Sequence, residues 1–531
     1  MSWGICTMAR TPLFRALRRH WQAAATPADG LTRRRFLAGS ARLATAGLVA
    51  GPVAACADVV ASGPLTGEPV VIVGAGAAGL TAAYALGKAG VPAVVYEAAG
   101  RVGGRIWTLN GFNADGQFIE LGAELVDTDH ADLRRICAEL GVGVQKFSEP
   151  PTDITGEIFH YRGQIYTGRQ FEQGLRPFVQ AVARARREIG GGASDLSVTY
   201  ATPMNAAAYD RMTLAEFLDR QTDVEPWVRE MVRIAYVGEM GSEADIQSAL
   251  NLILLMNPPR PGLYGDSDEA WRIAGGSSSM IEALRDAVVR RAGGSADSVL
   301  RLRHELTAIR DDGRQLVLSF DHGGQAVTVP ASRVVLALPF SVLRRVDGIA
   351  TLGLDPVKKR SIAEYGYGTN TKLMSDFSSR VWRTASNRIP AYDGFLTTDA
   401  GHQNFWETSR DQKGGHGVLT NFLGGKAGAD FSATAQRAPI RFLATLDPRL
   451  GPAFSGVQQF MNWSRYRFAL GSYSSPRPGQ YTAFFGVEAR PELGGRLLFA
   501  GEHTSVAYSG FMNGAVESGL RAARQALGRV A

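Results

Sequence analysis

The feature that most constrains this chain is a glycine-rich turn, Gly74-Ala-Gly-Ala-Ala-Gly79, between an apolar run and a helical segment. The run Pro69–Val73 is short and rich in β-branched residues, as is typical of a strand buried in a parallel sheet. Residues 77–89 are rich in Ala and Leu, and residues 93–96 form a second apolar run. Such an order within about 30 residues predicts a βαβ unit and therefore an α/β fold.

The three glycines predict a dinucleotide site. They allow a tight turn and a close approach of phosphate to the backbone, at a helix N-terminus whose dipole stabilises an anion. The acid that ends the second strand can accept hydrogen bonds from a ribose hydroxyl. The turn alone does not separate FAD from NAD. The residues predicted to surround the nucleotide are Gly74, Gly76, Ala78, Gly79, Glu97 and Ala98.

A second motif, Gly100-Arg-Val-Gly-Gly-Arg105, follows the second strand. It resembles the Gly-Gly-Arg signature of the flavin amine oxidase superfamily, which includes monoamine, polyamine and L-amino-acid oxidases. The resemblance implies that Arg101 and Arg105 face the phosphates or the flavin of FAD, beside Gly100 and Gly104. A nicotinamide dehydrogenase would leave this motif unexplained.

A third motif, Phe499–Thr504 followed by Ser509–Gly519, resembles the C-terminal flavin motif of the same superfamily. The resemblance implies that Glu502 contacts the ribityl or phosphate region and that the helix beginning near Met512 points its amides at the flavin. Negative charge develops there on reduction. His503 is interpreted as a packing residue rather than a base. The other cofactor contacts implied are Leu121, Gly122, Ala123, Glu124, Leu306, Gly501, Gly510, Phe511 and Ala515.

The resemblance also implies the catalytic residues. Lys372 stands where family members commonly place a lysine that holds a water near flavin N5 and assists the reaction with O2. Tyr473 and Phe511 match the two aromatic rings that flank the substrate amine. Monoamine oxidases carry a flavin-bonding Cys where this chain has Ser472, and the sequence has no Cys beyond Cys137. We therefore expect FAD to be held non-covalently.

Acids point to a cationic amine as the substrate. L-amino-acid oxidases usually carry a carboxylate-binding Arg where this chain has Leu125. Polyamine oxidases place an acid about where Asp127 lies, and Glu239 is a second candidate. Carboxylates in a closed pocket attract a cation. The alternative is that Asp127 and Asp129 cap a helix or face water.

The expected reaction is oxidation of an amine to an imine by hydride transfer to flavin N5. The imine hydrolyses to an aldehyde, and O2 becomes H2O2. One rival function is an L-amino-acid oxidase that uses Arg465 or Arg467 to bind the carboxylate. The other is a flavin-binding redox partner or scaffold without turnover.

The basic character of the chain resides in its first 55 residues. The formal net charge is +7, and that segment holds eight Arg and one acid. The remaining chain is thus neutral overall, which gives no support for nucleic-acid binding. The segment 32–37, Thr-Arg-Arg-Arg-Phe-Leu, resembles a twin-arginine export signal. We therefore expect the twin-arginine machinery as a partner and a periplasmic or cell-envelope location.

The predicted domain organisation begins with a signal peptide over 1–55 and a tether over 56–67. Cys56 either is lipidated and anchors the protein to the membrane, or follows an ordinary cleavage site. The body is expected to be a Rossmann-type FAD domain, like that of glutathione reductase, with an inserted α+β substrate domain. The FAD domain comprises 68–145, 268–345 and 460–531, and the substrate domain 146–267 and 346–459. The sequence contains no Cys/His cluster of the kind that binds a metal ion.

Overall fold

The computed structural model describes residues 67–149, 151–191, 196–256, 268–293 and 295–528. The predicted signal peptide, Cys56 and the tether up to residue 66 lie outside the described residues. Among the helices that are described, none is both long and apolar enough to cross a membrane.

A five-stranded parallel sheet forms the first layer of the fold, with the strand order β10-β2-β1-β14-β20. Its central strand β1 is buried throughout, which explains its uniformly apolar sequence. The predicted α/β class is confirmed. The strands are β1 (Val70–Val73), β2 (Ala93–Tyr96), β10 (Leu300–Arg301), β14 (Val334–Leu336) and β20 (Leu497–Phe499).

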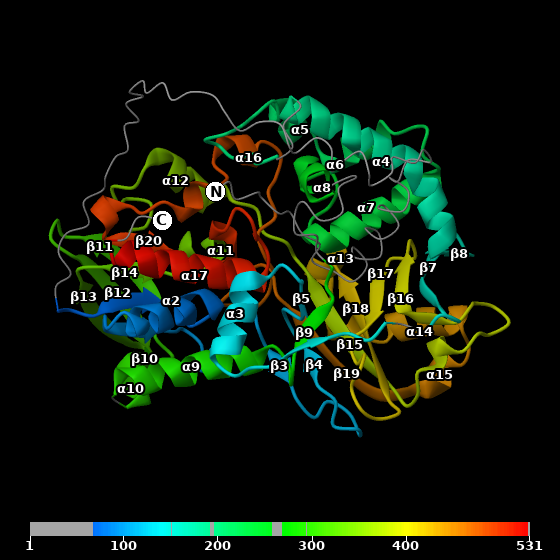
Figure 1. Cartoon of the computed structure of the whole chain (residues 1–531), viewed down its shortest axis with the longest axis horizontal. Helices are drawn as coiled ribbons and strands as arrows, with labels where there is room; N and C mark the ends of the chain where they lie inside the picture. The colour runs from blue at the N-terminus through cyan, green and yellow to red at the C-terminus, as the bar shows by residue number, and fades with distance from the viewer. Residues whose placement is uncertain (1–66, 150, 192–195, 257–267, 294, 529–531) are drawn as a thin grey trace, which may run out of the picture.

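Three helices pack beside this sheet, with α2 (Ala77–Lys88) lying between α17 (Met512–Ala526) and α9 (Ser278–Ala292), as Figure 1 shows. The contact between α2 and α17 depends on small residues. A Cβ added to Gly519 would lie 2.4 Å from the Ala78 carbonyl oxygen. The nucleotide turn and the C-terminal motif, more than 400 residues apart in the sequence, are thereby brought side by side.

A seven-stranded sheet forms the second large part of the fold, with the order β19-β15-β18-β17-β16-β7-β8. Its pairs are antiparallel except for β16 with β7. Helix α7 (Pro226–Met240) packs against β16, β17 and β18. The strands are β7 (Thr155–Tyr161), β8 (Gln164–Thr167), β15 (Thr371–Phe377), β16 (Tyr392–Thr398), β17 (Gln403–Glu407), β18 (Gly417–Leu423) and β19 (Phe454–Asn462).

The two large sheets draw on different parts of the chain. The parallel sheet takes its strands from 68–145, 268–345 and 460–531, and the larger sheet from 146–267 and 346–459, with β19 continuing to Asn462. The domain boundaries themselves stay a prediction. Residues 165–260, expected to be mainly helical, contain α4 (Gly168–Gly190), α5 (Ala207–Arg211), α6 (Leu214–Asp219), α7 and α8 (Leu250–Leu255).

Smaller elements complete the described part of the fold. There are two small antiparallel sheets, β3-β4 and β5-β9-β6, and β11-β12-β13 forms an antiparallel meander. These strands are β3 (Thr108–Leu109), β4 (Ile119–Glu120), β5 (Leu125–Val126), β6 (Val144–Lys146), β9 (Trp271–Ile273), β11 (Glu305–Asp311), β12 (Leu316–His322) and β13 (Gln325–Ala331). The other helices are α3 (Ala131–Glu139), α10 (Ala296–Val299), α11 (Phe340–Leu343), α12 (Pro356–Glu364), α13 (Gly425–Asp430), α14 (Ala438–Leu446), α15 (Leu450–Ala453) and α16 (Gln480–Ala483).

Candidate active site

A large cavity lies at the carboxyl ends of the parallel strands and extends to the seven-stranded sheet. It encloses about 1790 Å³ of empty space, including the part open to solvent. Carboxyl ends of parallel strands are where open α/β sheets bind ligands.

Most of the residues predicted for the site line this cavity. They are Gly74, Gly76, Ala78, Glu97, Ala98, Arg101, Gly104, Arg105, Gly122, Ala123, Glu124, Asp127, Leu306, Lys372, Tyr473, Gly501, Glu502, Gly510, Phe511, Met512 and Ala515. Four predicted residues are absent from the lining that the structure describes, namely Gly79, Gly100, Leu121 and Glu239.

Each of the three glycines of the turn has a different structural role. Gly74 has φ +105°, and a Cβ there would lie 2.7 Å from the Ala337 carbonyl oxygen. A Cβ on Gly79 would lie 1.9 Å from the Gly74 carbonyl oxygen, so this glycine is needed for packing within the turn. A Cβ on Gly76 would meet no protein atom within 4 Å, although Gly76 lines the cavity. The space in front of Gly76 at the start of α2 is therefore a cradle that fits a pyrophosphate.

The Glu97 carboxylate connects the two loops at the end of the parallel sheet. One oxygen accepts the Ala75 N–H at 2.7 Å and the other accepts the Ala99 N–H at 2.8 Å. Burial raises the pKa of Glu97, while these N–H groups and Arg101 oppose that effect. Each carboxylate oxygen has a further lone pair, so the group can still accept hydrogen bonds from ribose hydroxyls in the cavity.

The two arginines of the second motif serve different loops. Arg101 donates to the carbonyls of its own loop, at Val102 and Gly104, and its guanidinium lies 4.0 Å from the Trp107 ring centroid. Arg105 reaches two distant segments, because its Nη1 donates to the Ser472 carbonyl and to the Glu502 carboxylate of the C-terminal motif, both at 2.8 Å. Both side chains are thus fixed by the protein where they border the cavity.

Glu502 is the centre of the C-terminal motif. Its carboxylate accepts from Arg105 Nη1 at 2.8 Å, from the Ser474 hydroxyl at 2.7 Å and from the Gly510 N–H at 2.7 Å. Burial alone would raise the pKa of Glu502, but Arg105 and the hydrogen bonds prevail and lower it to about 2. Glu502 is therefore ionised, and it holds together three loops of the cavity wall.

The N-terminus of α17 opens toward the cavity. Phe511 is its N-cap residue, and Met512 and Ala515 in its first turn line the cavity. Among the described residues no side chain caps this end, and the first turn holds no acid. Its amides and dipole are thus available to a group that gains negative charge. His503, by contrast, is buried against Phe340, and burial lowers its pKa to about 3.

Lys372 forms an ion pair that the sequence did not predict. Its Nζ lies 2.7 Å from the Glu124 carboxylate and 3.0 Å from the Gly122 carbonyl oxygen, and the charged partners are both buried. The other Glu124 oxygen accepts the Thr408 hydroxyl. The family resemblance assigns Glu124 to the cofactor and names no protein partner for it. Pairing with a residue 248 positions away leaves no local signal in the sequence.

An aromatic wall completes the cavity. Tyr473 and Phe511 line it as expected, joined by Trp406 and Phe422, whose rings lie 5.2 Å apart. The latter two were missed because apolar residues in buried strands look alike in the sequence. The Tyr473 hydroxyl donates to the backbone carbonyl of Glu239 at 2.8 Å. Glu239 is fully buried, and it is absent from the cavity lining that the structure describes.

Asp127 is buried and lines the cavity, which argues against the alternative that it faces water. Nor does it cap α3, whose N-cap is His130 and whose start has no side-chain cap. One Asp127 oxygen accepts the Glu269 N–H at 2.5 Å, and the other lies 3.3 Å from His130 Nε2. Asp127 is therefore a carboxylate held in place at the cavity wall.

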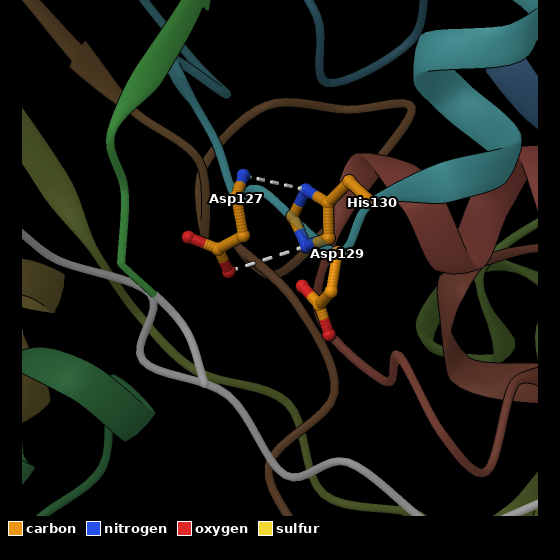
Figure 2. Close-up of side chains that lie close together, drawn as sticks. All are labelled: Asp127, Asp129 and His130. Carbon is orange, nitrogen blue, oxygen red and sulfur yellow. Dashed lines mark hydrogen bonds and ion pairs between the residues drawn. The ribbon is translucent and has the colours of Figure 1, made fainter. Parts of the chain in front are cut away.

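Asp127, Asp129 and His130 bring three potential metal-ligand atoms within 4.8 Å of one another (Figure 2). His130 Nδ1 accepts the Asp127 N–H at 3.1 Å. Burial lowers the pKa of His130 to about 3, so the ring is neutral and carries its proton on Nε2. A protonated nitrogen cannot ligate a metal, and this pattern fits an imidazole that orients Asp127.

The arginines of the rival hypothesis do not reach the cavity. Arg465 donates to the Ala429 carbonyl, and Arg467 pairs with Glu305 while remaining largely exposed. Neither belongs to the cavity lining that the structure describes. The arginines that do line it, Arg101 and Arg105, are occupied by protein acceptors.

Comparison with known proteins agrees with this geometry. The sequence model of the family "Flavin containing amine oxidoreductase" matches residues 77–527. The chain is 22% identical over 471 residues to an L-amino-acid oxidase of Pseudechis australis, covering 86% of each chain. It is 25% identical over 528 residues to a pseudooxynicotine dehydrogenase of Pseudomonas sp, covering 92% of this chain and 94% of that one. A structure of putrescine oxidase bound to putrescine matches with a TM-score of 0.69 at 22% identity, over 86% of this chain and 98% of that one.

Proposed function

Since this chain belongs to the flavin-containing amine oxidoreductase family, we propose that it is an FAD-dependent oxidase of a cationic amine. The products are an imine, which hydrolyses to an aldehyde, and H2O2 formed from O2. The observation that carries the choice of substrate is the charge of the cavity wall. Glu124 is paired with Lys372, and the carboxylates of Asp127 and Glu269 line the same cavity in addition to that pair. In a buried site such an excess favours a cation.

FAD would be held by the cradle at Gly76, by the loops that Arg105 and Glu502 join, and by the N-terminus of α17. When bound, it supplies the hydride acceptor at N5. Ser472 donates its hydroxyl to Asn370 at 2.6 Å and offers no thiol for a covalent bond. The protein's contribution is thus to bind FAD non-covalently and to stabilise negative charge at the start of α17.

The chain's own residues would orient the amine. Tyr473 and Phe511 flank the reacting nitrogen, which must be neutral for hydride to leave the adjacent carbon. Asp127, fixed by the Glu269 N–H and His130, holds a second ammonium of a diamine or polyamine. The aromatic wall of Trp406 and Phe422 encloses the carbon chain between the two ends and excludes water.

A peroxide assay on the purified holoenzyme tests this proposal, with a panel of monoamines, diamines, polyamines and L-amino acids. We expect turnover with amines and a preference for those with two cationic groups. Asp127→Asn should raise KM for a diamine about 10- to 150-fold, since a charged hydrogen bond contributes about 1.5–3 kcal/mol. Asp132→Asn, at the exposed start of α3, is the matched control and should leave KM unchanged.

Two results would overturn the substrate assignment. Activity confined to L-amino acids would favour the activity named for the Pseudechis australis relative. Reduction by amines without peroxide, but with turnover on a dye acceptor, would favour a dehydrogenase, as the Pseudomonas relative is named. Failure of every amine and amino acid to bleach the bound flavin anaerobically would contradict oxidase function itself.

We further propose that the protein is exported by the twin-arginine route, because the leader carries Arg33, Arg34 and Arg35 ahead of a Gly/Ala-rich run. That route carries folded proteins, and a flavoprotein can load FAD before it crosses. Replacing Arg33–Arg35 with Lys should retain the protein in the cytoplasm on fractionation. Mass spectrometry of the mature N-terminus distinguishes a lipidated Cys56 from a free one.

A further inference from the structure

The ion pair between Lys372 and Glu124 joins the two halves of the cavity. Lys372 lies on β15, in the interior of the seven-stranded sheet. Glu124 lies in the segment between β4 and β5 that crosses from the nucleotide side. The side chains are only 5% and 9% exposed, so the 2.7 Å pair is shielded from bulk water. Removing one partner of such a pair strongly destabilises the folded protein, because the other charge is left buried without a counterion.

Both Glu124 oxygens are engaged by the protein. One accepts from Lys372 and the other accepts the Thr408 hydroxyl. A carboxylate waiting for a substrate ammonium would offer an oxygen to the cavity with fewer protein donors. Asp127, by contrast, meets the Glu269 N–H and the His130 ring rather than a lysine ammonium.

Lys372 is also fixed in place. An ammonium has three N–H groups, and two are directed at the Gly122 carbonyl and the Glu124 carboxylate. The Nζ lies 5.4 Å from the Trp406 ring centroid, on the cavity wall. One N–H therefore remains for a molecule in the cavity, such as water.

Other charges act on the pair. Glu120 on β4 repels Glu124 and attracts Lys372, and burial raises the pKa of Glu120 to about 8. Arg272 on β9 is attracted to Glu124 and Glu120. Below pH 8 Glu120 is mostly neutral, so Glu124 is the principal counterion of Lys372.

We propose that Glu124 is a positioning residue that acts through Lys372. It holds the ammonium in place, with its third N–H toward the cavity. The inference rests on the proposed function, in which O2 takes two electrons from the reduced cofactor and two protons to become H2O2. A fixed cation stabilises the negative charge that oxygen gains before it is protonated. Glu124 thus serves the oxygen half-reaction rather than amine binding.

The test is Glu124→Gln, which keeps the size and one acceptor but removes the charge. The enzyme is reduced with dithionite, so the result does not depend on the substrate, and mixed with O2 in a stopped-flow instrument. We expect the reoxidation rate to fall at least tenfold at pH 7, where Glu120 is mostly neutral. Its pH profile should move to lower pH, because a buried ammonium without its counterion loses its proton more easily. Flavin reduction by amine should change less than threefold.

Two variants complete the design. Lys372→Met should abolish the pH dependence, and the double variant should reoxidise no more slowly than Lys372→Met alone. Thr408→Val removes a hydroxyl but no charge, and it should retain the wild-type pH profile. If Glu124→Gln instead raises KM for the amine and leaves reoxidation unchanged, Glu124 is a substrate anchor and the proposal is wrong.

The apoprotein gives a readout independent of activity. Glu124→Gln and Lys372→Met should each lower the melting temperature, because each leaves the other charge buried and unpaired. The double variant should lower the melting temperature by less than the sum of the two single decreases. Additive shifts would show that the pair is not coupled and would overturn the proposal. A lack of amine turnover, by contrast, would overturn only the proposed function, since reoxidation and melting would still report on Glu124.

Discussion

Replacing Gly76 by Ala separates the folding role of the glycine turn from its binding role. Gly76 has φ −75° and ψ −179°, which Ala adopts without strain. The new Cβ would meet no protein atom within 4 Å. We therefore expect the free energy of unfolding of the apoprotein to change by no more than about 1 kcal/mol. The methyl group would occupy the space where phosphate approaches the backbone.

The loss of cofactor affinity can be estimated from the hydrogen bonds at the start of α2. Displacing the pyrophosphate would weaken at least one charged hydrogen bond to a backbone amide, which contributes about 1.5–3 kcal/mol. The Kd for FAD should rise about 10- to 150-fold. Gly79→Ala should instead affect folding, since its Cβ would lie 1.9 Å from the Gly74 carbonyl oxygen. It should destabilise the apoprotein by about 3 kcal/mol or more.

The assay is titration of each apoprotein with FAD, followed by quenching of flavin fluorescence, together with urea unfolding without FAD. Wild-type affinity in Gly76→Ala would refute the reasoning, because it would mean that no phosphate lies against this residue. A large loss of apoprotein stability in the same variant would also contradict it. The contrast with Gly79→Ala shows whether the two glycines have separate roles.

Three further predictions follow from the site. The pKa of Glu502 is depressed to about 2, so its stabilisation is present above pH 4.5 and is lost as the pH falls toward 2. The stability difference between wild type and Glu502→Gln in urea unfolding should narrow by about 2 kcal/mol between pH 6 and pH 3. With Ser472 in place of a thiol, trichloroacetic acid should release all the flavin into the supernatant, and colour left in the pellet would disprove non-covalent binding. Tyr473→Phe loses the hydrogen bond to the Glu239 carbonyl but keeps the ring, so kcat/KM for the amine should fall less than fivefold, whereas Tyr473→Ala should lose more than tenfold.

The nucleotide end of the site could be predicted from the sequence because its determinants are local. A strand, a glycine turn and a helix follow one another within Val70–Lys88, and Gly79 is required by the Gly74 carbonyl of the same turn. Glu97 ends the following strand, so its distance from the turn is fixed by the length of one βαβ unit. Such relations survive in a single sequence.

The substrate end could not be predicted in the same way. Trp406 and Phe422 are apolar residues of buried strands, and only the pairing of β17 with β18 brings their rings to the cavity. Glu239 is an acid in an apolar helix, and its role as a substrate ligand stays a prediction: the residue is fully buried, it is absent from the described cavity lining, and its backbone carbonyl accepts the Tyr473 hydroxyl.

The sequence by itself thus determined the α/β class, the glycine cradle and the flavin motifs, because each depends on backbone conformation or on residues close in the chain. Only the tertiary structure decided which charges meet in the cavity. Lys372 pairs with Glu124 and Arg105 with Glu502 because the sheets bring together segments hundreds of residues apart. Burial makes these ion pairs important for stability, since a charge removed from water needs a partner within the fold.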